Sequence, residues 1–168
     1  MKRHMKRYCI FLLLMVVGII SVRAENSTNS FGIYLVTGNA TGDLSHVQPA
    51  KTPVISDADI VSYDFAKHLV KLKPKAFTRI RDRDRIATPF VLKVNRTRIY
   101  LGVFVSPISA VSYDVPSIIY DERMPDPELP PDVLRISRSY PDLGRLPGPD
   151  PRSDARIKDV LAALHKLK

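Results

Sequence analysis

Proline is concentrated in the last third of this chain. Eight of the fourteen prolines, at positions 125, 127, 130, 131, 141, 147, 149 and 151, fall between Glu122 and Arg152. Proline has no backbone N–H and fixes φ near about −65°, so such a stretch resists continuous helices and central strands. We therefore expect residues 122–152 to form an extended, partly stiff linker, with the folded domain before it.

The first 24 residues have the composition of a secretory signal. Four basic residues open the chain, an apolar run follows from Cys9 to Ile20, and the segment ends in Val22-Arg23-Ala24. This order is typical of a cleavable signal, and the apolar run is shorter than the about 20 residues that span a bilayer. We expect cleavage near Ala24 and a periplasmic or secreted product, the alternative being a retained membrane anchor.

Cleavage changes the charge balance of the chain. The full sequence has 26 basic and 17 acidic residues, a net charge of +9. Residues 1–24 hold five of the basic residues and none of the acidic ones, which leaves 21 against 17, or +4. A mildly basic chain without a base-reading motif does not indicate nucleic acid as a partner.

Cysteine usage bears on the compartment. The single cysteine, Cys9, lies in the expected signal, so the mature part has no disulfide. An exported domain that relies on its core alone favours a bacterial envelope compartment over a disulfide-rich secreted scaffold.

The pattern from Thr52 to Asp121 is that of one compact domain, preceded by a polar leader and a first strand within 25–51. The expected strands cover 31–36, 60–63, 68–72, 89–94, 98–104 and 117–120, and a short helix follows Pro74 over 75–80. The clearest element is the hairpin around Asn95-Arg96-Thr97, because both arms alternate in polarity. This order predicts an α+β fold: a mainly antiparallel sheet with one packed helix, then the Pro-rich tail and a C-terminal amphipathic helix.

The last segment, 153–168, has helical periodicity. Its apolar side chains share one face of a helix over 154–167: Ile157, Val160, Leu161 and Leu164. Two interpretations remain open, since this face either folds back on the domain or docks on a partner or an anionic membrane. The short length argues against strong membrane binding by the helix alone.

Two groups of residues form the candidate partner surface. The first group lies on the second arm of the hairpin and consists of Arg98, Tyr100 and Leu101. If that arm is the outermost strand, its free backbone groups accept an extended peptide by strand addition. The second group lies on the apolar face of the terminal helix and consists of Ile157, Leu161 and Leu164.

No pattern in the sequence indicates catalysis, a cofactor or a metal. The histidines of the expected mature chain lack metal-ligand spacing and are interpreted as solvated side chains: His46, His68 and His165. The densest acidic group lacks the features of a calcium loop and is interpreted as capping: Asp57, Asp59 and Asp64. No serine lies in a nucleophile elbow, and no glycine-rich phosphate loop is present.

Part of the chain resembles a known family. The matching runs are Thr52-Pro-Val-Ile-Ser-Asp-Ala-Asp-Ile-Val-Ser-Tyr-Asp, Leu69-Val-Lys-Leu-Lys-Pro-Lys-Ala-Phe, Thr88-Pro-Phe-Val-Leu-Lys-Val-Asn and Arg98-Ile-Tyr-Leu-Gly-Val-Phe. They resemble the head subdomain of the first periplasmic domain of SecD-type protein-export subunits, and small exported bacterial proteins with the same block. The resemblance implies an α+β head that contacts polypeptide, and it does not extend to proton-driven export.

Together these observations predict a non-enzymatic, exported protein- or peptide-binding module. The expected partner is an envelope protein or an extended polypeptide, with no nucleic acid and no strong membrane binding after signal cleavage. The alternative is an inhibitor or accessory subunit of an envelope enzyme or of the export machinery.

Overall fold

The computed structural model describes residues 29–37, 44–81, 87–120, 126–142, 144 and 146–168, and most of its secondary structure is one sheet of eight strands. The strands are β1 (Phe31–Leu35), β2 (Ile55–Ser56), β3 (Ile60–Asp64), β4 (Leu69–Leu72), β5 (Thr88–Val94), β6 (Thr97–Val105), β7 (Ser117–Ile119) and β8 (Val133–Ser137). The helices are α1 (Pro74–Arg81) and α2 (Ala155–Ala163), with 3₁₀ turns η1 (Asp57–Asp59) and η2 (Pro151–Ser153). The expected signal, 1–24, lies outside the described residues.

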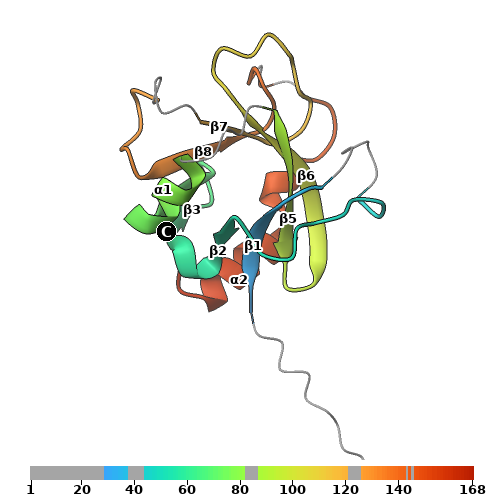
Figure 1. Ribbon diagram of the computed structural model, residues 1–168. Coiled ribbons are helices and arrows are strands. Elements are labelled where there is room, and N and C mark those ends of the chain that lie inside the picture. The colour runs from blue at the N-terminus through green and yellow to red at the C-terminus, as the bar shows by residue number, and fades with distance from the viewer. Residues whose placement is uncertain (1–28, 38–43, 82–86, 121–125, 143, 145) are drawn as a thin grey trace, which may run out of the picture.

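The sheet curls into a nearly closed barrel. Its strand order is β2-β1-β5-β6-β7-β8-β4-β3, and every pair is antiparallel except β6 with β7. The two outer strands, β2 and β3, follow one another in the chain with only η1 between them. The ends of the sheet are therefore joined by three residues, and the strands enclose a common interior (Figure 1).

Both edges of this sheet are short or covered. The edge strand β2 has only two residues. At the other edge, the backbone N–H of Tyr63 donates to the carbonyl of Lys166 at 2.7 Å, and the N–H of Lys168 donates to the carbonyl of Tyr63 at 2.9 Å. Within the described residues, neither edge presents the long free row of backbone groups that strand addition uses.

The expected α+β fold was wrong. The expected strands lie close to where β1, β3, β4, β5, β6 and β7 are found, but β2 and β8 extend the sheet to eight strands and close it. The short helix α1 begins at Pro74, which the sequence indicated as a residue of its first turn. The error lies in the long-range pairing, because β8 joins β7 to β4 and thereby connects two hairpins that look separate in sequence.

The Pro-rich segment contributes a strand instead of forming only a linker. Two of its prolines occupy the second position of β-turns: the N–H of Leu129 donates to the Asp126 carbonyl across Pro127, and the N–H of Val133 donates to the Pro130 carbonyl across Pro131. Proline suits this position because its φ is already that of the turn. The stretch Val133–Ser137 has no proline, so its N–H groups are free to pair in the sheet.

Helix α2 folds back onto the sheet and fills its interior. The side chains of Ile157 and Leu161 are completely buried, and Val160 is nearly so. They pack with the larger hydrophobic cluster, which includes buried side chains from all eight strands. The helix contacts β1 and β5, and Figure 1 shows it behind these two strands.

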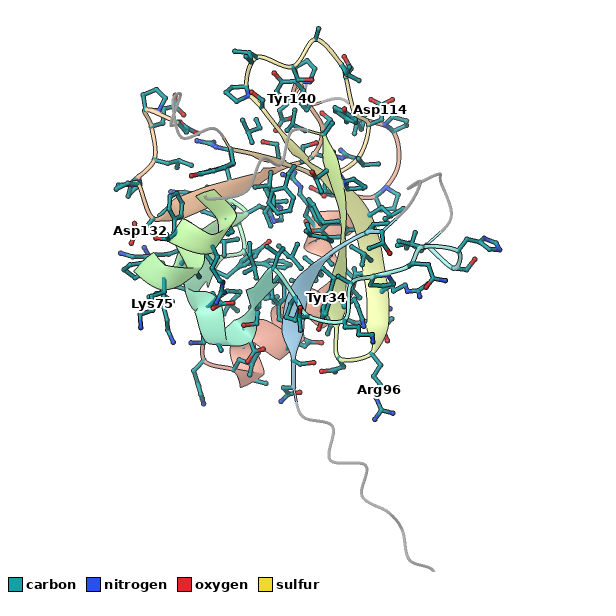
Figure 2. All side chains as sticks on the ribbon, viewed as in Figure 1. Tyr34, Lys75, Arg96, Asp114, Asp132 and Tyr140 are labelled. Carbon is teal, nitrogen blue, oxygen red and sulfur yellow. The ribbon has the colours of Figure 1, made fainter. Side chains whose placement is uncertain are left out.

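The hairpin β5–β6 depends on two small features. Asn95 has φ of 55° at the turn, and its side chain accepts a hydrogen bond from the backbone of Ser30 at 2.9 Å. The next residue, Arg96, projects away from the body of the protein (Figure 2). In β6, Gly102 lies opposite Phe90, and a Cβ at Gly102 would overlap the Phe90 ring and the carbonyl oxygen of Pro116. Glycine there permits the close approach.

We predict that Gly102→Ala destabilises the protein by about 1–3 kcal/mol, because a methyl group would have to displace a packed ring and a backbone carbonyl. Urea unfolding followed by tyrosine fluorescence measures the change. Gly144→Ala is the control, since a Cβ there meets nothing within 4 Å and only the positive φ of 66° is costly. A loss of less than about 1 kcal/mol in Gly102→Ala would contradict the packing argument.

Leu161→Ala should lower the free energy of unfolding by about 2–5 kcal/mol, since it leaves a cavity in the centre of the core. The matched control is Asp159→Ala on the exposed face of the same helix, which we expect to change stability by less than about 0.5 kcal/mol. A tethered helix that packs on nothing would show no difference between these variants.

Candidate functional site

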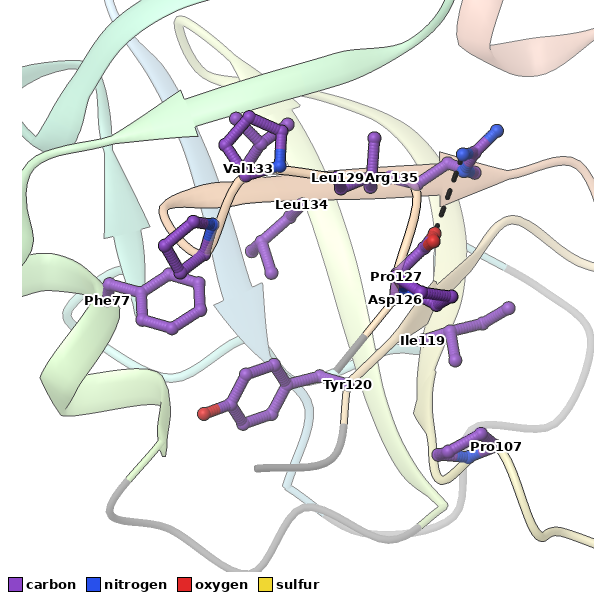
Figure 3. Close-up of a pocket in the computed structure, with 12 residues that line it drawn as sticks. Phe77, Pro107, Ile119, Tyr120, Asp126, Pro127, Leu129, Val133, Leu134 and Arg135 are labelled. Atoms are coloured by element: carbon purple, nitrogen blue, oxygen red, sulfur yellow. Dashed lines mark ion pairs between the residues drawn. The ribbon is translucent and has the colours of Figure 1, made fainter. Parts of the chain in front are cut away.

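An apolar pocket of about 300 Å³ lies at the surface between α1, β7 and β8 (Figure 3). One wall is an aromatic pair, Phe77 from α1 and Tyr120 just after β7, whose rings meet edge to face at 5.5 Å. The rest of the lining includes Leu129 and three prolines from the turns that precede β8, and Leu134 from β8 itself. These rigid side chains hold the pocket open at little entropic cost.

Charged groups are confined to the rim. The Arg135 guanidinium, on β8, lies 3.2 Å from the Glu128 carboxylate and 3.4 Å from the Asp126 carboxylate. Figure 3 shows Arg135 and Asp126 at one end of the pocket, away from the rings. An apolar floor with a few polar groups at the edge is typical of sites that bind an organic side chain.

The strand residues of the candidate partner surface lie inside the sheet. β6 pairs with β5 along most of its length, whereas β7 pairs only with Val103–Val105, so the Arg98–Leu101 part of β6 is paired with β5 alone. Tyr100 is buried, and Leu101 packs against a small cluster around Val91. The Arg98 guanidinium donates to the carbonyls of residues 44 and 45 at 2.6 and 3.0 Å. These three side chains support the fold and do not form a common exposed surface.

The helix residues of the candidate partner surface also face inward. Ile157 and Leu161 belong to the core, and Leu164 packs against it while remaining partly exposed. A partner that docked on this face would have to displace α2 from the sheet. The helix group therefore forms no accessible site, whereas Tyr100 and Leu101 of the strand group line a second surface pocket of about 460 Å³, beside the segment Tyr113–Pro116.

A partly buried ion pair lies at the end of the Pro-rich segment. The Arg152 guanidinium contacts the Asp150 carboxylate through two nitrogens, at 2.7 and 3.0 Å, and donates to the carbonyl of Ile136 on β8 at 2.7 Å. Although burial opposes it, hydrogen bonding and charge from Arg152 hold the pKa of Asp150 below its usual value. This pair fixes η2 against β8.

Three further polar side chains lie near this ion pair. The hydroxyls of Tyr63 and Tyr100 are buried and have no hydrogen-bond partner among the described residues. Burial raises the pKa of both phenols, and Arg152 and Asp150 modify the effect. His68 is buried, not solvated as expected, and its Nε2 lies 3.9 Å from Asp150. The group is closed off by packing, which fits a structural role.

Asp59 has the capping role that the sequence indicated. Its carboxylate accepts hydrogen bonds from the N–H and the hydroxyl of Ser56 at 2.9 and 2.8 Å, and it contacts Arg79 at 2.8 Å. Ser45 and His46 share a hydrogen-bond distance of 3.1 Å, but both are exposed neighbours on one turn and lie outside the apolar pocket.

Two other kinds of feature are missing from the described residues. No cluster of three or more His, Cys, Asp or Glu side chains suited to a metal ion is found in this part of the chain. Neither of its helices is long and apolar enough to cross a bilayer.

The fold and the pocket define a small barrel-like β domain with an apolar surface site. Comparison with protein-family models, curated proteins and solved structures finds no match to this chain. The resemblance to SecD-type head subdomains therefore stays a prediction, and the function has to be argued from the site itself.

The pocket residues were not among the predicted site residues. Phe77 and Tyr120 lie in or next to elements that the sequence indicated, and the proline density before β8 is visible in the sequence. The sequence pattern that could have indicated the pocket is the grouping of prolines around Leu129 and Val133. What was missing was the pairing of β8 with β7, which brings this segment to the aromatic side chains.

The buried histidine predicts a pH dependence of stability. Burial and the positive charge of Arg152 lower the pKa of His68 from its ordinary value of 6.5, whereas Asp150 and Asp64 oppose the shift. Below about pH 6.5 the unfolded chain therefore binds the proton before the folded one does, and stability falls as the pH decreases. The slope is at most about 1.4 kcal/mol per pH unit.

Unfolding free energies measured between about pH 7.5 and 5 test this, because histidine titrates within that range. We expect His68→Asn to flatten the profile. The matched control is His165→Asn, because His165 also has a positive φ, 55°, but is exposed. A flattened profile in the control and not in His68→Asn would contradict the assignment.

Proposed function

We propose that this chain is a non-enzymatic, exported binding module of the bacterial envelope. Its pocket between α1, β7 and β8 binds an extended, proline-containing apolar segment of another polypeptide. The observation that carries the proposal is the pocket itself, with an aromatic pair and rigid prolines in its lining. Export is supported by the signal pattern of residues 1–24.

The shape and chemistry of the pocket support this class of ligand. Grooves lined by aromatic rings commonly recognise polyproline-type segments, because these are already extended and lose little entropy on binding. A volume of about 300 Å³ is at the small end for binding sites and holds one or two side chains. The guanidinium of Arg135 at the rim has N–H groups suited to a peptide carbonyl.

The covered sheet edges favour side-chain recognition over strand addition. The C-terminal residues already bond to Tyr63 at the edge of β3, and β2 is too short to hold an added strand. The C-terminal part of β6, Val103–Val105, already pairs with β7, which leaves at most its short Arg98–Leu101 part for an added strand. A peptide is thus better accommodated by the pocket than by the backbone of the sheet.

A ten-residue peptide of alternating proline and leucine provides the test, with binding followed by NMR of methyl groups. We expect Leu129 and Val133 methyl signals to shift, with a Kd on the order of 10–100 µM for so small a contact. A peptide with serine in place of each leucine is the ligand control. Shifts confined to other regions of the folded protein would contradict the proposal.

Leu129→Asp places a charge on the wall of the pocket and should weaken peptide binding about tenfold or more, since an unpaired carboxylate would be desolvated. Leu146→Asp is the matched control, because Leu146 is also half-buried on a loop but does not line this pocket. Equal losses of affinity in the two variants would show that the pocket does not hold the peptide.

A further inference from the structure

A second surface, which adjoins the pocket at Pro107, projects from the loop that joins β6 to β7. Among the described residues, three large hydrophobic side chains are notably exposed, and two of them lie in this loop: Ile108 at 71% and Val111 at 55%; the third is Val61 on β3, at 44%. Ala110 between them is also exposed. We call the segment Pro107–Ser112 the apolar tip. Isolated exposed hydrophobics are ordinary, but a contiguous group is typical of a contact site.

The apolar tip is held in one conformation by hydrogen bonds. Pro107 occupies the second position of a turn in which the N–H of Ser109 donates to the Ser106 carbonyl at 3.0 Å. The hydroxyl of Ser109 then accepts from the N–H of Val111 at 3.2 Å. Two serines and a proline therefore fix the path of the backbone on which Ile108 and Val111 are presented.

The base of the loop is closed as firmly as its end. Tyr113 and Tyr140 exchange two backbone hydrogen bonds, of 2.6 and 2.8 Å, and the Tyr140 hydroxyl donates to the carbonyl of Pro107 at 2.7 Å. Figure 2 shows Tyr140 and Asp114 at the same end of the molecule. A loop fixed in this way loses little conformational entropy when it binds, so its exposed side chains can contribute most of their burial to affinity.

The charges around the apolar tip identify the kind of partner. Asp114 is exposed close to the base of the loop, and Asp142 is exposed two residues after Tyr140. Arg138 on the same side is turned inward, with its guanidinium donating to the Gly148 carbonyl at 2.6 Å. Exposed acidic groups repel an anionic lipid surface and attract basic side chains on a protein.

We propose that the apolar tip inserts into an apolar socket, bordered by basic side chains, on a folded partner protein. This inference does not rest on the pocket as a peptide site, because the tip is a rigid projection whereas the pocket is a concave receptor. It gives the alternative of an inhibitor or accessory subunit a definite contact surface. The apolar tip, and not the apolar face of α2, is then the surface that contacts the partner, because the face of α2 is buried in the core.

The test is a photo-crosslinking residue at Ser112, which is exposed beside Val111, in the full chain produced in its native cells. We expect one discrete protein adduct. The double variant Ile108→Asp, Val111→Asp should reduce that adduct by about tenfold or more, because the tip would be the energetic centre of the contact. Asp114→Lys should reduce it several-fold by removing the attraction to basic side chains.

Matched controls separate this surface from others. Val61→Asp makes the same kind of change at the remaining exposed hydrophobic side chain, and the adduct should persist. Leu129→Asp in the pocket should also leave the adduct, so a failure of the peptide proposal is distinguishable from a failure of this one. Thermal unfolding of each purified variant establishes that the fold is retained.

Three results would overturn the inference. The adduct could survive the double variant, or no discrete protein adduct could form at Ser112. Alternatively, purified protein could float with phosphatidylglycerol vesicles in a manner that depends on Ile108 and Val111, which would assign the apolar tip to a membrane surface.

Discussion

The burial of α2 within the curled sheet is the interaction on which the rest of the structure depends. Eight strands that curl this far enclose a volume that must be filled, and Ile157 and Leu161 lie at its centre. The same segment carries Arg152, which bonds to the carbonyl of Ile136 on β8, and it ends in residues that cover the edge of β3. Loss of the C-terminal segment from Arg152 onward would therefore uncover the core, remove the Arg152 hydrogen bond to β8 and expose the edge of β3 in a single step.

Proline at the second position of turns links the fold to both proposed surfaces. Pro127 and Pro131 turn the chain ahead of β8 and line the pocket, while Pro107 starts the apolar tip and also borders the pocket. In each case the ring fixes φ before folding, which lowers the entropy lost on ordering the loop. A composition that looks like a linker in the sequence thus provides rigid loops on a scaffold of strands.

Local structure could be predicted from this sequence, whereas its long-range pairing could not. The alternation in residues 89–104 and the turn at Asn95 indicated the hairpin, and Pro74 indicated the start of α1. The strand β2 has two residues, too few for an alternating pattern of apolar and polar residues. The strand β8 lies among prolines, which made its segment look like a linker in the sequence.

The site residues were less predictable for the same reason. Whether β6 is an edge or a central strand depends on its parallel pairing with β7, which no local pattern specifies. The apolar face of α2 was visible as a face, but the sequence does not say what covers it. The exposed side chains Ile108 and Val111 look like ordinary core residues until the turn around Pro107 is seen to point them outward.

The central claim is that β8 and α2 belong to one cooperative unit with the hairpin β5–β6. Native-state amide hydrogen exchange tests it most directly, because it reports the opening free energy of each segment separately. The account predicts that the amides of Ile136 and Leu161 exchange as slowly as that of Leu92, through global unfolding alone. Fast exchange at Ile136 and Leu161 beside a protected Leu92 would contradict it, because the C-terminal third of the chain would then open independently of the hairpin.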